Sequence, residues 1–218
     1  TCALPILKGI YPKKIEDAKN TNVHIQKTVY LLGGNKILQY NTSNNEVTEV
    51  LQAPDASMKV PSRCQSLYLE KENMIVTVGG ILDGKLCDNC YIFTPPNFAK
   101  VTTLPNFPRP IRNVSLTYYR GTLYAVGGET ETGEAEGISG DIYSLKMNPP
   151  GSKWEKFYQL PLPRRSANLA VIGGVLYIFG GYSGNRNRST QIDTVNLFTN
   201  EYRKDNCRLP IGVEGGTL

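Results

Sequence analysis

The chain has 218 residues, of which 40% are hydrophobic, and its formal net charge is +5. No apolar stretch approaches the roughly 18 residues that a membrane-spanning helix needs, and no run of Lys and Arg resembles a nucleic-acid-binding arm. We therefore expect no membrane and no nucleic-acid partner. The 21 Gly and 14 Pro are scattered along the chain, which favours many short strands joined by turns.

The start of the chain, TCALPILKGIYPKK, lacks the basic–apolar–small order of a secretory signal. We expect a cytoplasmic protein, with secretion as the alternative. Three Asn-x-Ser/Thr sequons, at Asn41, Asn113 and Asn187, would matter only in the secreted case.

An apolar run followed by a Gly doublet occurs four times. The first glycines of successive doublets are 46, 48 and 53 residues apart, and such a period is typical of units that bury their faces against one another. Each run is short, rich in Val, Ile, Leu and Tyr, and stopped by Gly, which predicts a buried strand. The four runs are Thr28–Gly34, Met74–Gly80, Thr122–Gly128 and Val175–Gly181.

Each unit continues with a polar loop, a short strand, and a final strand that carries a bulky anchor, after which Leu-Pro turns lead into the next unit. The anchors are Val47, Phe98, Trp154 and Tyr202. Four strands per unit are typical of a propeller blade. We predict one all-β domain over residues 1–218, a β-propeller of four repeats. The repeats span about 1–52, 53–103, 104–159 and 160–208, and 209–218 starts a further repeat or closes the ring.

The two ends of the chain carry the same pattern. Cys2-Ala-Leu-Pro-Ile6 matches Cys207-Arg-Leu-Pro-Ile211, 205 residues later. This match has two interpretations: four blades close a small ring, or the chain is a segment of a larger propeller, since propellers have about four to eight blades.

The Gly doublets and the stretches Leu160–Ser166 and Gly173–Tyr182 resemble the kelch repeat, most closely that of BTB–kelch proteins. The resemblance covers about residues 21–202 and is closest in the fourth unit. It implies a protein-interaction module that binds a partner or substrate peptide, as the recognition domain of a cullin ubiquitin-ligase adaptor whose cullin-binding domains are absent here. The alternative is a structural kelch protein that binds cytoskeletal or extracellular partners.

The repeated residues have structural roles under this hypothesis. Two glycines at the end of an inner strand allow positive φ and close approach of neighbouring strands, while the anchor aromatics fill the wedge between blades. The residues assigned to these roles are Gly33, Gly34, Gly79, Gly80, Gly127, Gly128, Gly180, Gly181 and Trp154.

The candidate binding residues lie in the turns that lead into the blades. By resemblance, arginines from successive turns converge on one face and grip acidic side chains of a peptide, and Tyr182 reaches into it. A guanidinium suits this task because it binds a carboxylate bidentately. The alternative is that these arginines brace the blade through backbone carbonyls. The candidates are Arg63, Arg112, Arg164, Arg165 and Tyr182.

The sequence gives little support for a metal, a cofactor or an enzyme. Cys87 and Cys90 form a C-x-x-C, but a zinc site needs further ligands, and His24 is the single histidine. That one histidine cannot supply the paired ligands of a kelch-fold copper oxidase, and it has no nucleophile context. We therefore expect no cofactor, no metal and no catalytic residue, and we leave the disulfide state of the five cysteines open.

Overall fold

A computed structural model describes residues 21–25, 27–33, 36–51, 59–96, 98, 101–130, 137–147, 153–184 and 187–215. The predictions for Gly34 and for residues 1–20, including Cys2–Ile6, lie outside these ranges. The described residues form four four-stranded antiparallel sheets and contain no α-helix. No helix in this part of the chain is therefore long and apolar enough to span a membrane.

Each sheet is a meander of four consecutive strands, and we call it a blade. Blade 1 contains β1 (Thr21–Ile25), β2 (Thr28–Gly33), β3 (Lys36–Asn41) and β4 (Glu46–Leu51). Blade 2 contains β5 (Gln65–Leu69), β6 (Met74–Leu82), β7 (Lys85–Phe93) and β8 (Val101–Thr103). Blade 3 contains β9 (Ser115–Tyr119), β10 (Thr122–Val126), β11 (Asp141–Lys146) and β12 (Glu155–Gln159). Blade 4 contains β13 (Asn168–Ile172), β14 (Val175–Phe179), β15 (Gln191–Asn196) and β16 (Tyr202–Arg208).

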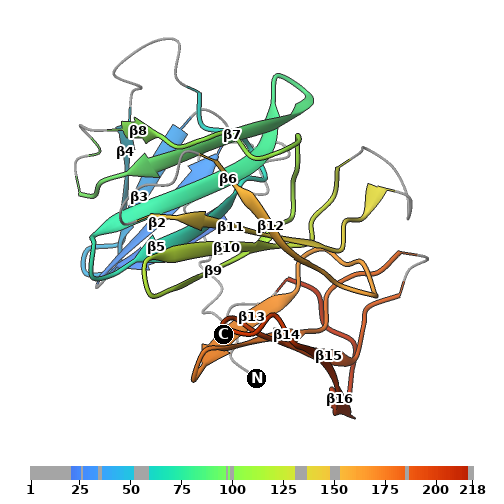
Figure 1. Cartoon of the computed structure of the whole chain (residues 1–218). Coiled ribbons are helices and arrows are strands. Elements are labelled where there is room, and N and C mark those ends of the chain that lie inside the picture. The colour runs from blue at the N-terminus through green and yellow to red at the C-terminus, as the bar shows by residue number, and fades with distance from the viewer. Residues whose placement is uncertain are drawn as a thin grey trace.

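The four predicted strands are confirmed as β2, β6, β10 and β14, but β6 does not stop at its glycines: it continues through the doublet to Leu82, with a register shift between Val78 and Gly80. The first strands of successive blades contact one another, β1 with β5, β5 with β9, and β9 with β13. Among the described residues the blades form an open array of β-propeller blades rather than a closed ring (Figure 1). Each sheet lies within one of the four predicted repeats, whose exact limits remain a prediction.

Three apolar clusters hold neighbouring blades together. Because side chains alternate along a strand, the second strand of each blade offers one set of residues to the blade before it and another to the blade after it. Between blades 1 and 2, Tyr30 and Leu32 of β2 share a cluster with Ile75 of β6. Between blades 2 and 3, Val76 and Val78 of β6 share one with Leu123 and Ala125 of β10. Between blades 3 and 4, Tyr124 and Val126 of β10 share one with Leu176 and Ile178 of β14.

The anchor aromatics fill the spaces between blades at two of the predicted positions. The Trp154 indole is buried, donates from Nε1 to the Pro105 carbonyl at 3.0 Å, and lies 5.1 Å from the Phe107 ring. Phe98 is fully buried, 5.0 Å from the Tyr30 ring. The prediction is wrong at Val47, which is 42% exposed, because Glu46–Glu49 of β4 are exposed on both sides of the strand.

The first glycine of a doublet lies against the turn that leads into the following blade. Gly127 has φ of 65°, and its Cα lies so close to the Arg164 carbonyl oxygen that an added Cβ would collide with it. The hairpin residue Gly173 has a similar φ of 59°, but nothing lies within 4 Å of the position of its Cβ. Comparing the two positions therefore separates the cost of a left-handed backbone conformation from the cost of close packing.

Gly127→Ala is expected to lower the free energy of unfolding by about 2–4 kcal/mol, because Ala there is both left-handed and in collision with a carbonyl. Gly173→Ala should cost only about 1 kcal/mol, since the left-handed conformation is its one penalty. Urea unfolding of both variants measures the difference. Equal losses would show that close approach of the blades does not explain the glycine at position 127.

Candidate functional site

The turns that lead into blades 2, 3 and 4 share one backbone geometry. One residue of each turn, Ser62, Arg112 or Arg165, forms a two-residue antiparallel bridge with the residue that follows the Gly doublet, which is Ile81, Glu129 or Tyr182. The next residue of each turn is left-handed, and these residues are Arg63, Asn113 and Ser166 with φ of 53°, 55° and 51°. We call these segments the lead-in turns.

This geometry separates the four candidate arginines into three positions. Arg112 and Arg165 are structurally equivalent, whereas Arg63 stands one residue later and Arg164 one residue earlier in its turn. The expected convergence of equivalent arginines therefore applies to Arg112 and Arg165.

Arg164 is fully buried inside blade 4. Its Nη1 donates to the carbonyl of Gly180 at 3.0 Å and more weakly to that of Gln191 at 3.4 Å, and Nη2 is ion-paired with Asp193. Asp193 Oδ1 also accepts hydrogen bonds from the side-chain Nε2 of Gln191 at 2.7 Å and from the Tyr202 hydroxyl at 2.6 Å. The arrangement of Arg164 is therefore that of a residue bracing its blade through backbone carbonyls.

Glu129 joins the two equivalent arginines across the boundary between blades 3 and 4. Its Oε1 accepts from Arg112 Nη2 at 2.7 Å, and its Oε2 accepts from Arg165 Nη1 at 2.5 Å. Asn113 adds an amide donor to Oε2 at 3.2 Å. The Glu129 side chain is only 3% exposed, so it is a buried carboxylate held by two guanidinium groups.

Arg165 extends this group toward solvent. Its Nε donates to Glu214 at 3.2 Å, and its guanidinium carbon lies 4.4 Å from the centre of the Tyr182 ring, within the range of a cation–π contact. Arg188, with a side chain 65% exposed, approaches Glu214 at 3.7 Å. We call Arg112, Glu129, Arg165, Tyr182 and Glu214 the arginine–glutamate cluster.

Arg63 makes none of the ion pairs found among the described residues. Glu129 and Glu214 were missed by the sequence analysis, although Glu129 directly follows a Gly doublet. For Glu129 the available signal was its place directly after a Gly doublet, which is also the place of Tyr182.

The electrostatics of the cluster favour the charged forms of Glu129 and Arg165. Burial alone would raise the pKa of Glu129, but hydrogen bonds and charges from Arg112 and Arg165 outweigh it and lower the pKa below the ordinary value. Burial would likewise lower the pKa of Arg165, and the carboxylates of Glu129 and Glu214 raise it instead.

Glu129→Gln is expected to lower the free energy of unfolding at pH 7 by about 1–3 kcal/mol, because two guanidinium groups lose their shared carboxylate while Arg165 remains partly hydrated. The folded pKa of Glu129 lies below its ordinary 4.5. The stabilisation is therefore fully present above pH 4.5 and is lost as pH falls through the lower folded value. Urea unfolding of wild type and variant from pH 7 to pH 3 should show the two curves converging at low pH. A difference that stays constant down to pH 3 would contradict this assignment.

The cysteines of the C-x-x-C are buried free thiols, as is Cys64. Burial raises the pKa of Cys64 and of Cys90 to about 12, so both remain protonated at neutral pH. Within the described ranges, no group of three or more His, Cys, Asp or Glu side chains could hold a metal ion. The thiols of blade 2 therefore pack as small apolar groups.

Comparison with known proteins agrees with this architecture. Residues 163–195 match the kelch motif. Kelch-like protein 40 of Xenopus laevis is 24% identical over 193 residues, which cover 82% of this chain and 30% of that protein. Kelch repeat and BTB domain-containing protein 1 of Cowpox virus is 26% identical over 137 residues, 62% of this chain and 23% of that protein.

The fold also matches the solved structure of YjhT with a TM-score of 0.68 and 15% identity, over 90% of this chain and 68% of that one. The chain thus contains a kelch motif and has β-propeller architecture. It spans less than a third of the length of the two curated relatives named above.

Proposed function

We propose that the domain recognises an acidic segment of a protein partner, and that the arginine–glutamate cluster is the centre of the binding face. The observation that supports this proposal is the side-by-side placement of Arg112 and Arg165, which come from adjacent blades and share one carboxylate. Two guanidinium groups fixed in this way form a rigid platform for carboxylates.

The charge of the platform favours an acidic ligand. Three guanidinium groups, of Arg112, Arg165 and Arg188, face two carboxylates, of Glu129 and Glu214, which leaves one positive charge in excess. The side chains of Arg165 and Arg188 are 25% and 65% exposed, so they are the groups that a partner can reach.

The other candidates take distinct parts in this proposal. Tyr182 packs on the guanidinium of Arg165 and offers the partner an aromatic edge. Arg63 lies in the lead-in turn of blade 2, one residue after the position of Arg112 and Arg165. Arg164, being buried, acts by fixing the turn that carries Arg165.

The binding face is tested by selecting acidic peptides on an array with the wild-type chain and titrating the strongest binder by calorimetry. Arg165→Ala combined with Tyr182→Ala should weaken binding by about 2–5 kcal/mol, as expected for loss of a partly desolvated charge contact. The control is Arg203→Ala, which removes a side chain that is 81% exposed on β16. Unchanged affinity in the double variant, or selection of no acidic peptide, would refute the proposal.

We further propose that the domain is the substrate-recognition part of a BTB–kelch cullin ubiquitin-ligase adaptor. The name of the Cowpox virus relative, which combines kelch repeats with a BTB domain, supports the BTB–kelch part of this proposal. The complete open reading frame provides the test: BTB and BACK sequences upstream, and copurification of a cullin with the full-length protein, are the expected results. A secretory signal upstream would refute the adaptor role and favour an extracellular kelch protein, while leaving the acidic-partner proposal intact.

A further inference from the structure

The β15–β16 turn of blade 4 carries an aromatic residue, Phe198, that its backbone does not require. In the equivalent β3–β4 turn of blade 1, the side-chain oxygen of Asn41 accepts from the Ser43 amide at 2.9 Å. In blade 4, that of Asn196 accepts from the Phe198 amide at 2.9 Å. Strand register places both asparagines opposite the first residue of their blade's second strand. Phe198 therefore occupies the position at which blade 1 has a serine.

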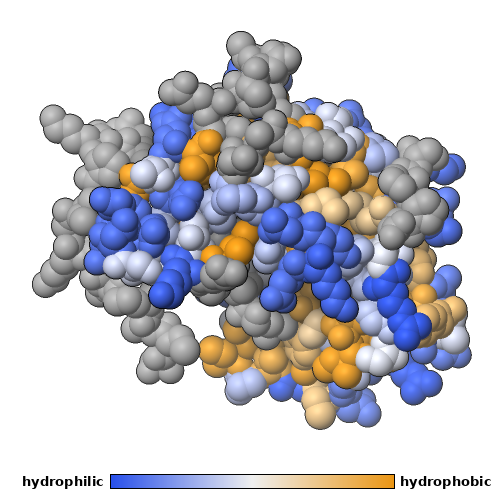
Figure 2. Space-filling view, turned by 90° about the vertical axis from the view of Figure 1, so that its left-hand side faces the viewer, coloured by the Kyte–Doolittle hydropathy of each residue, from blue (hydrophilic) through white to orange (hydrophobic). Residues whose placement is uncertain are grey.

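The Phe198 ring lies on the surface rather than in the core. It is 63% exposed and covers Gly174 of the adjacent β13–β14 hairpin so closely that a Cβ on that glycine would collide with the ring. Ile172, the last residue of β13, is 66% exposed at the start of the same hairpin. Figure 2 shows apolar surface gathered at the lower end of the molecule, at the height of blade 4 in Figure 1. One end of blade 4 thus exposes two large apolar side chains.

Arg120 joins this surface from blade 3. It is exposed in the β9–β10 hairpin, and its guanidinium carbon lies 5.8 Å from the centre of the Phe198 ring and 5.5 Å from that of the Tyr119 ring, within the range of cation–π contacts. The two rings are themselves 6.3 Å apart in an edge-to-face arrangement. We call Tyr119, Arg120, Ile172 and Phe198 the Phe–Arg patch.

The backbone at Arg120 does not favour an arginine. Arg120 and Gly121 are the two central residues of a tight hairpin, with φ of 47° and 81°. The equivalent hairpin of blade 4 has two glycines, Gly173 and Gly174, with φ of 59° and 81°. Because both positions require positive φ, glycine and asparagine are the usual residues there. The arginine is therefore better explained by what its side chain contacts at the surface than by the turn.

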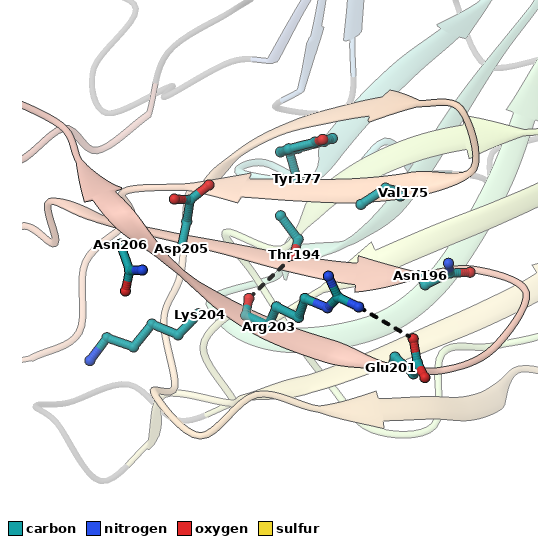
Figure 3. A pocket seen from close by; sticks show the side chains of 9 residues that line it. All are labelled: Val175, Tyr177, Thr194, Asn196, Glu201, Arg203, Lys204, Asp205 and Asn206. Atoms are coloured by element: carbon teal, nitrogen blue, oxygen red, sulfur yellow. Dashed lines mark hydrogen bonds and ion pairs between the residues drawn. The ribbon is translucent and has the colours of Figure 1, made fainter.

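The positive charge of Arg120 has no carboxylate partner among the described residues. The carboxylates of the adjoining turns are directed elsewhere. Glu72 of the β5–β6 hairpin accepts from the Tyr118 hydroxyl at 2.9 Å. Glu201 of the β15–β16 turn faces Arg203 at 4.0 Å, as Figure 3 shows. The patch thus combines exposed apolar side chains with one uncompensated, planar cation.

We propose that the Phe–Arg patch binds a peptide segment of a protein partner in which a carboxylate stands next to a large apolar side chain. The carboxylate pairs bidentately with Arg120, and the apolar side chain covers Phe198 and Ile172. The acidic residues of the adjoining turns, Glu72 and Glu201, oppose an anionic membrane surface and so favour the peptide.

The Phe–Arg patch is separate from the partner-binding face proposed above. Because β13 runs from the lead-in turn of blade 4 to Ile172, the patch lies at the ends of the strands opposite the lead-in turns. Binding at the patch therefore does not rest on the function proposed for the arginine–glutamate cluster.

The proposal is tested by probing an array of short peptides with the whole chain and with its Phe198→Ser variant, which gives blade 4 the residue that blade 1 has at this position. Peptides that bind the first and not the second are titrated by fluorescence anisotropy. We expect them to carry Asp or Glu beside a large apolar residue, and Arg120→Gln to weaken their binding about 30-fold, as for loss of a hot-spot residue. Replacing the acidic residue of the peptide by its amide should cost wild type as much and Arg120→Gln little further, because both changes remove one ion pair.

Two controls make the outcome specific. Ile211→Ser removes an apolar side chain that is 69% exposed at the lead-in end of blade 4, and it should leave binding unchanged. Arg165→Ala combined with Tyr182→Ala should also leave it unchanged, which distinguishes this surface from the arginine–glutamate cluster. The proposal is overturned if no selected peptide depends on Phe198, or if Arg120→Gln binds as wild type does. It is also overturned if wild type but not Phe198→Ser binds vesicles of phosphatidylcholine and phosphatidylserine, or dimerises by light scattering, since the occupant would then be a membrane or a second copy.

Discussion

Arg164→Met is expected to lower the free energy of unfolding by about 3–5 kcal/mol, because removing one member of a buried ion pair leaves the other charge uncompensated. Asp193 would lose its guanidinium partner in a fully buried position, and the Gly180 carbonyl would lose its donor. Urea unfolding at pH 7 measures the loss.

Two further variants separate charge from volume. Arg203→Met removes a guanidinium that is 81% exposed and should change stability by no more than about 0.5 kcal/mol. In Arg164→Met combined with Asp193→Leu, both charges are gone, and much of the lost stability should return because a buried pair can be replaced by apolar groups. A small loss in Arg164→Met alone would mean that the buried pair does not brace blade 4.

Trp154→Ala is the second change with a large expected effect, a loss of about 3–5 kcal/mol, as for other buried aromatic residues cut back to Ala. The indole fills the space between blades 2 and 3 and holds the Pro105 carbonyl and the Phe107 ring. Urea unfolding followed by far-ultraviolet circular dichroism measures the loss, since the chain has no other tryptophan.

An exposed aromatic residue serves as the comparison. Phe198→Ala removes a ring of the same class that is 63% exposed, so the expected cost is at most about 1 kcal/mol. Similar losses in the two variants would show that Trp154 does not act as the wedge between the blades.

Much of the fold is predictable from the sequence because one signal is repeated four times. An apolar run stopped by two glycines is unambiguous when it recurs at nearly constant spacing, and the structure places every such run as the second strand of a blade. The prediction of a buried anchor at Val47 was wrong because the alignment of units does not reveal whether the last strand of a unit is covered. Residues 46–49 of β4 are exposed on both sides.

The candidate site was less predictable, because the repeat pattern does not show what each side chain contacts. Arg164 and Arg165 are neighbours of the same type, yet one is fully buried against Asp193 and the other reaches Glu129 and Tyr182. Glu129 is 36 residues away from Arg165 in the chain. Its role depends on the contact between two blades, which a repeat pattern does not contain.

The most direct test of the acidic-partner face is a charge exchange between the domain and its ligand. In an acidic peptide selected by the wild-type chain, one carboxylate is replaced by Lys, and both peptides are titrated against wild type and Arg188→Glu, which reverses an exposed charge and leaves the buried pairs of Arg165 intact. We expect Arg188→Glu to lose affinity for the original peptide and to regain it for one of the Lys-substituted peptides, because a direct ion pair survives reversal of both charges. If no Lys substitution restores binding, or if Arg188→Glu binds the original peptide as wild type does, the arginine–glutamate cluster and the adjoining Arg188 are not the contact face.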